Sequence, residues 1–236
     1  MAIVFTALGG CALVPYIILR VKKRGLEGLL VKIGVSMCFI LTAASPLLGE
    51  GAPLFPRLRF GVLAGLVCGL LGDILLDLKD MYPQHKDAYV FAGFTAFLVG
   101  HFFYVGGLWS AYGFSLKKLW IAALAGLLLV VAVLLTEKPM KLRYGRFKGI
   151  SLGYGFVLAF MVATAWSCYA FAGGGMDPGR ITAMLMGIGG ALFLASDMIL
   201  SGTFFGKGFD KPVDYALNYT LYYGAQFLIA WSLAAM

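Results

Sequence analysis

Charged side chains are scarce in this chain. Asp, Glu, Lys and Arg make up 13% of its 236 residues, while hydrophobic residues make up 61%. A typical soluble domain has about 25% charged and about 45–50% apolar residues. This composition excludes a soluble enzyme, a disordered segment and a nucleic-acid-binding module.

Histidine and cysteine are also few. The chain has two His and four Cys, and no two cysteines form a CxxC pair. The sequence therefore indicates neither a disulfide framework nor a multi-histidine zinc site. We expect the cysteines to be small hydrophobic residues of the core, since all of them fall in apolar runs: Cys11, Cys38, Cys68 and Cys168.

Long apolar runs account for most of the chain. A bilayer core about 30 Å thick needs about 20 apolar residues per helix, and these runs do not alternate as β-barrel strands do. The sequence predicts an all-α integral membrane protein, a bundle of eight transmembrane helices in one polytopic domain over residues 1–236. The last run is the least apolar, because Asn218, several tyrosines and Gln226 interrupt it. The runs are 2–19, 28–48, 58–78, 88–109, 115–136, 149–172, 180–205 and 213–235.

The basic residues indicate an orientation. If the N-terminus lies outside, the external loops hold Arg57, Arg59, Lys117, Lys118 and Arg180, and most other basic residues are cytoplasmic. The positive-inside rule then places both termini on the non-cytoplasmic side. The cytoplasmic set is Arg20, Lys22, Lys23, Arg24, Lys79, Lys86, Lys138, Lys141, Arg143, Arg146, Lys148, Lys207 and Lys211.

The net charge of +8 follows from this topology and from attraction to anionic lipid headgroups. It requires no nucleic-acid partner, and the sequence shows no sign of an obligate protein partner. We expect a multi-pass membrane protein, in the inner membrane if the cell is bacterial.

Glycine is abundant, at 32 residues. Gly61, Gly65 and Gly69 are spaced four apart, and Gly149 and Gly153 repeat that spacing. Small residues at this spacing allow helices to approach closely in lipid. We therefore expect a closely packed bundle.

Three aspartates fall within or near the predicted spans. An ionisable group in a span is costly and marks a functional site by default. Asp73 lies in GLLGDILLDL, and Asp77 lies four residues later on the same helix face. Because Asp77 is close to the end of its span, we expect a solvated, interfacial side chain there. Asp197 lies deep in ALFLASDMIL, and we expect the preceding Ser196 to bond to the backbone one turn back.

Lys32 and His101 are the other ionisable residues within spans. Lys32 lies one turn inside the second run, where it either extends to the interface or pairs with Asp73 or Asp197. His101, in FLVGHFFYV, is a lone histidine of the kind that usually packs with one hydrogen bond.

The last span carries a polar stripe. Asn218, Tyr222 and Gln226 are each four residues apart, with Tyr219 and Tyr223 beside them. Gln226 lies too deep for an interfacial aromatic belt, so it bonds to another helix or lines a cavity. Residues of four spans map to the cytoplasmic half of the bilayer, which predicts one shared cavity open to that side: Lys32, Asp73, Asp197, Asn218, Tyr219 and Tyr222.

These motifs together resemble a known family. GLVCGLLGDILLDL, FAGFTAFLVGHFFYV, GGALFLASDMIL and NYTLYYGAQFLIAWSL occur in the order and spacing of the YhhN family, which includes the lysoplasmalogenases. The resemblance covers spans two to eight. It departs at Lys32–Ile33, where the family commonly has Lys-Pro.

The resemblance implies an eight-helix hydrolase of the vinyl ether bond in lysoplasmalogens. The products are a fatty aldehyde and glycerophosphoethanolamine or glycerophosphocholine, and the reaction needs no metal or organic cofactor. The expected substrate is a lysophospholipid within the bilayer, whose headgroup meets Lys32 and the basic loops.

Vinyl ether hydrolysis needs a proton donor for the alkene, a carboxylate beside the oxocarbenium ion that forms, and a base for the attacking water. The same logic applies to glycoside hydrolysis by two carboxylates. Asp73 and Asp197 are the expected catalytic pair, and the sequence leaves open which is the acid. The expected substrate-binding residues are Lys32, Asp77, His101, Ser196, Asn218, Tyr219, Tyr222 and Gln226.

Other classes of membrane protein fit less well. Intramembrane aspartyl proteases carry GxGD, whereas the glycines here have the wrong spacing, in Gly69-Leu70-Leu71-Gly72-Asp73. Two histidines disfavour a zinc-dependent lipid amidase. A proton-coupled transporter is the alternative, because buried Asp and Lys serve proton relays; it predicts access from both sides and no chemical conversion. A structural or lipid-sensing role predicts tolerance of Asp73→Asn.

Overall fold

The computed structural model describes residues 1–48, 55–139, 141–172, 177–206 and 211–234, and within these ranges it is helical without any strand. The all-α class predicted from the sequence is thus confirmed. Short 3₁₀ helices are η1 (Ser45–Leu48), η2 (Pro83–His85) and η3 (Gly145–Phe147). The long helices are α1 (Ala2–Val21), α2 (Gly25–Ala44), α3 (Pro56–Met81), α4 (Lys86–Tyr112), α5 (Leu116–Glu137), α6 (Lys148–Phe171), α7 (Pro178–Phe205) and α8 (Pro212–Ala234).

Seven of these helices, α1 to α7, are long and apolar enough to cross a membrane, judged on the described ranges. In α8 the polar residues noted above lower the mean hydropathy. These lengths and compositions indicate a multi-pass membrane protein.

The helix ends follow local chemistry. Proline is the first residue of α3, α7 and α8, where its missing N–H costs no helical hydrogen bond. Asp177 caps α7 by accepting a hydrogen bond from the backbone N–H of Arg180 at 2.7 Å. Among the predicted spans, 28–48 differs most from the observed helix bounds. The reason is that α2 ends at Ala44 and the chain continues as the 3₁₀ helix η1 from Ser45. Position 235 of the last predicted span lies outside the described residues.

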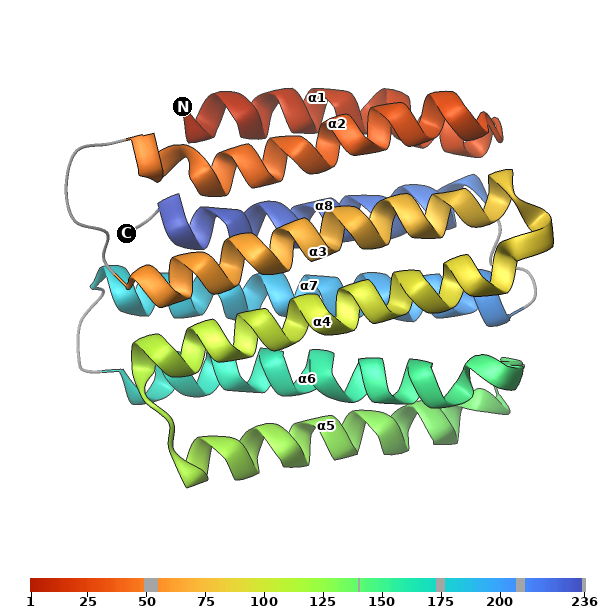
Figure 1. Cartoon of the computed structure of the whole chain (residues 1–236). Helices are drawn as coiled ribbons and strands as arrows, with labels where there is room; N and C mark the ends of the chain where they lie inside the picture. The colour runs from red at the N-terminus through yellow and green to blue at the C-terminus, as the bar shows by residue number, and fades with distance from the viewer. Residues whose placement is uncertain (49–54, 140, 173–176, 207–210, 235–236) are drawn as a thin grey trace.

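Six helices form a closed ring (Figure 1). Going round it, α2 packs on α3, α3 on α4, α4 on α6, α6 on α7, α7 on α8, and α8 back on α2. Outside the ring, α1 packs against α2 and α8, and α5 packs against α6. Helix directions alternate, so α1 begins and α8 ends at the same end of the bundle.

Glycine allows the closest helix contact, between α3 and α4. A Cβ on Gly61 would lie 2.6 Å from the backbone oxygen of Phe103, and one on Gly65 would lie 2.1 Å from the Tyr104 ring. The expectation for this stripe is therefore confirmed. For Gly149 and Gly153 it is wrong, because no neighbouring helix lies within 4 Å of a Cβ built on either residue.

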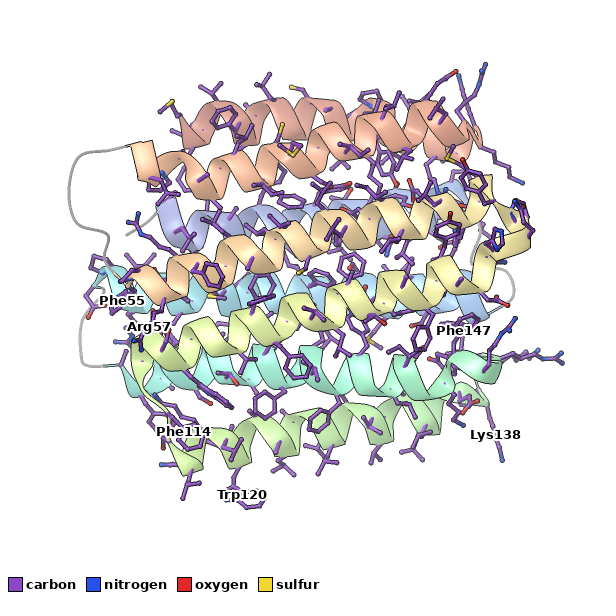
Figure 2. All side chains as sticks on the ribbon, in the orientation of Figure 1. Phe55, Arg57, Phe114, Trp120, Lys138 and Phe147 are labelled. Carbon is purple, nitrogen blue, oxygen red and sulfur yellow. The ribbon has the colours of Figure 1, made fainter. Side chains whose placement is uncertain are left out.

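The basic residues predicted to be cytoplasmic gather at the end of the bundle marked by Lys138 and Phe147, opposite Arg57 and Phe114 (Figure 2). Lys207 lies outside the described residues. Which end faces the cytoplasm stays a prediction.

Three expectations about single residues are wrong. Lys79 is not in a loop, because α3 extends to Met81 and buries it. Lys118 is likewise buried, in the first turn of α5, where its ammonium group donates to the last carbonyls of α4 and of the following glycine. Cys11 is exposed on α1 and is not a core residue; among the four cysteines Cys168 is the buried one.

Candidate active site

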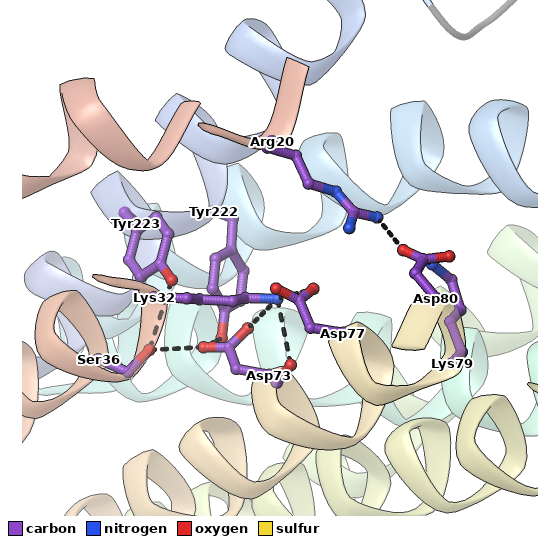
Figure 3. A network of polar contacts seen from close by, with 9 residues as sticks. All are labelled: Arg20, Lys32, Ser36, Asp73, Asp77, Lys79, Asp80, Tyr222 and Tyr223. Carbon is purple, nitrogen blue, oxygen red and sulfur yellow. Dashed lines mark hydrogen bonds and ion pairs between the residues drawn. The ribbon is translucent and has the colours of Figure 1, made fainter. Parts of the chain in front are cut away.

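Asp73 lies at the centre of a buried polar network formed by α2, α3 and α8 (Figure 3). Its Oδ2 accepts hydrogen bonds from the hydroxyl of Ser36 at 2.7 Å and from the hydroxyl of Tyr222 at 2.9 Å. Its Oδ1 lies 3.3 Å from Nζ of Lys32. Both carboxylate oxygens therefore have partners, as a buried ionised group requires.

Lys32 joins the two aspartates of the α3 face. Its Nζ donates to Oδ1 of Asp77 at 3.0 Å and to the backbone oxygen of Asp73 at 3.2 Å. The same ammonium group lies 5.8 Å from the ring centre of Tyr16 and 5.7 Å from that of Tyr219. Of the two partners that the sequence allowed, Lys32 pairs with Asp73, and it does not extend to the interface.

Asp77 is buried, so the expectation of a solvated side chain is wrong. The physical reason is that α3 runs one turn further than predicted, to Met81. Asp77 therefore lies within the bundle, where Nζ of Lys32 from α2 pairs with its carboxylate at 3.0 Å.

The polar stripe of α8 faces this network. The amide of Gln226 donates to the Tyr222 hydroxyl at 2.9 Å, and Tyr222 in turn donates to Asp73. One turn earlier, Nδ2 of Asn218 donates to the backbone oxygen of Ser196 at 2.7 Å and ties α8 to α7. The hydroxyl of Ser196 bonds to the carbonyl of Phe193, the local role expected for it.

Asp197 reaches the same region from α7. It is half-buried, and its Oδ2 accepts a hydrogen bond from the hydroxyl of Tyr154 on α6. Asp73 and Asp197 thus differ in their surroundings, since three side chains hold Asp73 and one side-chain hydrogen bond is recorded for Asp197.

A small cavity, which we call the inner pocket, lies between these groups and has a volume of about 30 Å³. Eight of the ten predicted site residues line it, which agrees with the expected shared cavity: Lys32, Asp73, Asp77, Ser196, Asp197, Asn218, Tyr219 and Tyr222. The rest of its wall is Arg20, Leu76, Lys79, Phe97, Leu200 and Phe204.

The two other predicted site residues, Gln226 and His101, do not line the inner pocket. The amide of Gln226 donates a hydrogen bond to Tyr222, which does line it. His101 is buried among the rings of Tyr104, Tyr154 and Phe193, and its Nδ1 bonds to the backbone oxygen of Phe97 at 2.7 Å. His101 therefore has the packing environment expected of a lone histidine.

A second, larger cavity of about 710 Å³ opens at the basic end of the bundle. It shares Arg20, Asp77, Lys79 and Phe204 with the inner pocket, so the two cavities adjoin. We call it the basic vestibule, because seven of its lining residues are cationic: Arg20, Lys23, Arg24, Lys79, Lys86, Arg143 and Arg146.

Sequence reasoning missed several residues of the site. Ser36 lies one turn after Lys32, a spacing that places both on one helix face and was a usable signal. Tyr154 and Tyr16 gave none, because tyrosines are common near span ends and a single sequence does not show which helices become neighbours. Arg20, assigned to a loop, lies in the last turn of α1 and lines both cavities.

The described residues contain no group of three or more His, Cys, Asp or Glu arranged to hold a metal ion.

Comparison with known proteins places the chain in one family. Neither the search of curated proteins nor that of solved structures finds a match. The model of the YhhN family matches residues 28–233, which include every residue of the inner pocket except Arg20. The chain therefore belongs to the YhhN family.

Proposed function

We propose that this protein hydrolyses the vinyl ether bond of lysoplasmalogens, with Asp73 and Asp197 as its catalytic carboxylates. The observation that carries the proposal is that these two residues, from α3 and α7, line one pocket in different hydrogen-bonding environments. The reaction needs two carboxylates with different roles. Membership of the YhhN family supports the same activity.

The reaction begins with proton transfer to the outer carbon of the alkene. The electron pair of the double bond forms the new C–H bond, and the carbon that bears the ether oxygen becomes part of an oxocarbenium ion. Water adds to that carbon and loses a proton, which gives a hemiacetal. Collapse of the hemiacetal breaks the bond to the glycerol oxygen and releases a fatty aldehyde and the glycerophospho-base.

Hydrogen bonding suggests how the two aspartates divide these roles. Lys32, Ser36 and Tyr222 all present donors to Asp73, which stabilises its ionised form and suits it to face the oxocarbenium ion. Asp197 has the simpler environment, with Tyr154 as its side-chain partner. We assign Asp197 as the proton donor, with Tyr154 holding its carboxyl group in position.

The inner pocket leaves room for a water molecule beside the carboxylates. Its volume of about 30 Å³ exceeds the about 10–15 Å³ that one water molecule needs. Lys32, paired with two carboxylates, is a positioning residue in this proposal, and the headgroup is bound elsewhere.

The test is an assay of aldehyde release by the purified protein in detergent. We expect release from a 1-alkenyl lysophospholipid and none from the matching 1-acyl lysophospholipid. Because general acid–base catalysis contributes about 10²–10⁴-fold, Asp73→Asn and Asp197→Asn should each lower turnover by about 100-fold or more.

Asp177→Asn is the matched control. It makes the same change from carboxylate to amide at the N-cap of α7, where Asn caps as well as Asp. Near-normal turnover in Asp73→Asn or Asp197→Asn removes that residue from the mechanism. A folded wild-type protein that releases no aldehyde contradicts the proposed function and favours the transporter class.

A further inference from the structure

Each acidic residue of the basic vestibule has a cationic partner within the protein. Asp77 pairs with Lys32 at 3.0 Å, and Asp87 pairs with Arg146. Asp80 lies 2.7 Å from the Arg20 guanidinium and 2.8 Å from Nζ of Lys79. The anionic groups of the cavity wall are thus already paired with cations of the chain.

Three cations of the same cavity remain without an acidic partner. Among the described residues, no carboxylate lies within ion-pair distance of Lys23, Lys86 or Arg143, and all three are exposed. They come from three separate segments of the chain: the turn after α1, the first residue of α4 and the connection from α5 to α6. Three unpaired cations that converge on one cavity favour an anionic ligand.

The backbone fixes one of these three segments. The N–H of Arg143 donates to the carbonyl of Phe205 at 2.7 Å, which ties the connection from α5 to α6 to the end of α7. Phe205 lines the same vestibule. The backbone of Arg143 is therefore fixed beside the cavity that its side chain lines.

The position and size of the vestibule restrict the ligand. Its volume of about 710 Å³ lies within the range of about 300–1,000 Å³ typical of small-molecule sites. It lies beside the inner pocket, with which it shares four lining residues. In a lysophospholipid, a glycerol backbone separates the anionic phosphate from the bond at the first carbon.

We propose that Lys23, Lys86 and Arg143 bind the phosphate diester of a lysophospholipid headgroup and thereby make the enzyme select phosphorylated substrates over neutral vinyl ethers. This inference rests on the proposed function and names the headgroup site for it. The phosphate lies in the basic vestibule, and the glycerol backbone passes Arg20 and Asp77 to place the vinyl ether at Asp197.

The experiment compares two substrates that share the vinyl ether and differ in the phosphate. The full-length protein in neutral detergent is given 1-alkenyl-glycerophosphoethanolamine or 1-alkenylglycerol. The test variant is Lys23→Gln/Lys86→Gln/Arg143→Gln. The control variant is Lys22→Gln/Lys138→Gln/Lys141→Gln, which removes the same charge from the same end of the bundle but not from the vestibule wall.

We expect the test variant to raise KM for the phospholipid by about tenfold or more with kcat nearly unchanged, because charge-assisted contacts are lost from substrate binding. Its activity toward 1-alkenylglycerol should equal that of the wild type, which also shows that the variant is folded. The control variant should match the wild type on both substrates. Arg143→Gln alone should give a smaller rise in KM.

Two soluble phosphate compounds distinguish a headgroup site from a simple phosphate site. Glycerophosphoethanolamine should inhibit the wild type, and it should inhibit the test variant less. Inorganic phosphate should inhibit more weakly than the diester. Inhibition by inorganic phosphate equal to that by the diester overturns the headgroup assignment.

A binding measurement separates this proposal from the proposed function. A 1-alkyl lysophospholipid, which lacks the vinyl bond, should raise the melting temperature of the wild type more than that of the test variant. If the wild type cleaves neither substrate, the proposed function fails. The shift in melting temperature still shows whether these three cations bind the phosphate. Equal KM values in wild type and test variant, or an equal rise in the control variant, overturn the proposal.

Discussion

Lys32 is the residue on which two buried aspartates depend. Asp73 and Asp77 lie four residues apart on one face of α3, and the Lys32 ammonium group lies within 3.3 Å of both carboxylates. Removing one partner from a buried ion pair leaves an uncompensated charge, which costs more than the pair itself contributes. The network therefore depends on the position of the Lys32 ammonium group between the two carboxylates.

We predict that Lys32→Met lowers the free energy of unfolding by about 3–5 kcal/mol, because two carboxylates of like charge then face each other in a buried site. Adding Asp77→Asn to Lys32→Met should recover part of that loss. Thermal unfolding in detergent of both single variants and the double variant completes the cycle. A Lys32→Met protein that melts like the wild type contradicts the electrostatic account.

At this scale the sequence identifies the charged members of the site but not their uncharged partners. A carboxylate or ammonium group in an apolar run is conspicuous, because burial is costly for each. Ser36 and Tyr154 are not conspicuous, since a hydroxyl in a helix can bond to its own backbone. That they donate to Asp73 and Asp197 depends on which helices become neighbours.

The contact of α3 with α4 shows what a spacing pattern does and does not predict at the scale of the element. Glycines four apart identify a helix face with no side chains. On α3 that face receives α4, whereas on α6 the face with Gly149 and Gly153 receives no neighbour within 4 Å. The pattern is the same, and the packing partner is a property of the fold.

Two single substitutions test this difference. We predict that Gly61→Ala destabilises the protein by about 1–3 kcal/mol, because its Cβ would lie 2.6 Å from the backbone oxygen of Phe103, which cannot rotate away. Gly153→Ala should be neutral or stabilising by up to about 1 kcal/mol, since its Cβ meets open space and alanine favours the helix. Melting temperatures of the two variants in detergent test both predictions. Equal shifts in the two variants would contradict this packing.

Helix boundaries were predictable for a physical reason. The apolar stretch that a bilayer demands has a fixed length, and Pro56, Pro178 and Pro212 each begin a helix close to where the runs start. Asp77 was misplaced because α3 continues past the apolar run to Met81. Polar groups beyond a run can stay helical when other helices cover them.

At the scale of the whole molecule, the ring of six helices brings distant segments together. Contacts of α2 with α8, and of α4 with α6, close the ring and join segments that no local pattern connects. The sequence predicted a common depth for the polar residues, because depth follows from distance along a helix. It did not predict the order of helices around the ring, which places Asp197 and Asp73 on one cavity.

The orientation of the bundle in the membrane can be tested. The basic vestibule opens at one end of the bundle, and the positive-inside rule predicts that this end faces the cytoplasm. Lys138 and Arg57 lie at opposite ends (Figure 2). In a background where the four native cysteines are replaced by alanine, Lys138→Cys and Arg57→Cys give one reporter for each end.

We predict that a membrane-impermeant maleimide labels Arg57→Cys in intact cells and labels Lys138→Cys only after the membrane is permeabilised. A reporter on the C-terminus should behave like Arg57→Cys, because α8 ends where α1 begins. The opposite labelling pattern would reverse the orientation and open the vestibule to the outside. Labelling of both positions from the same side would contradict the membrane-spanning bundle itself, since the length of α3 and α5 separates the two ends.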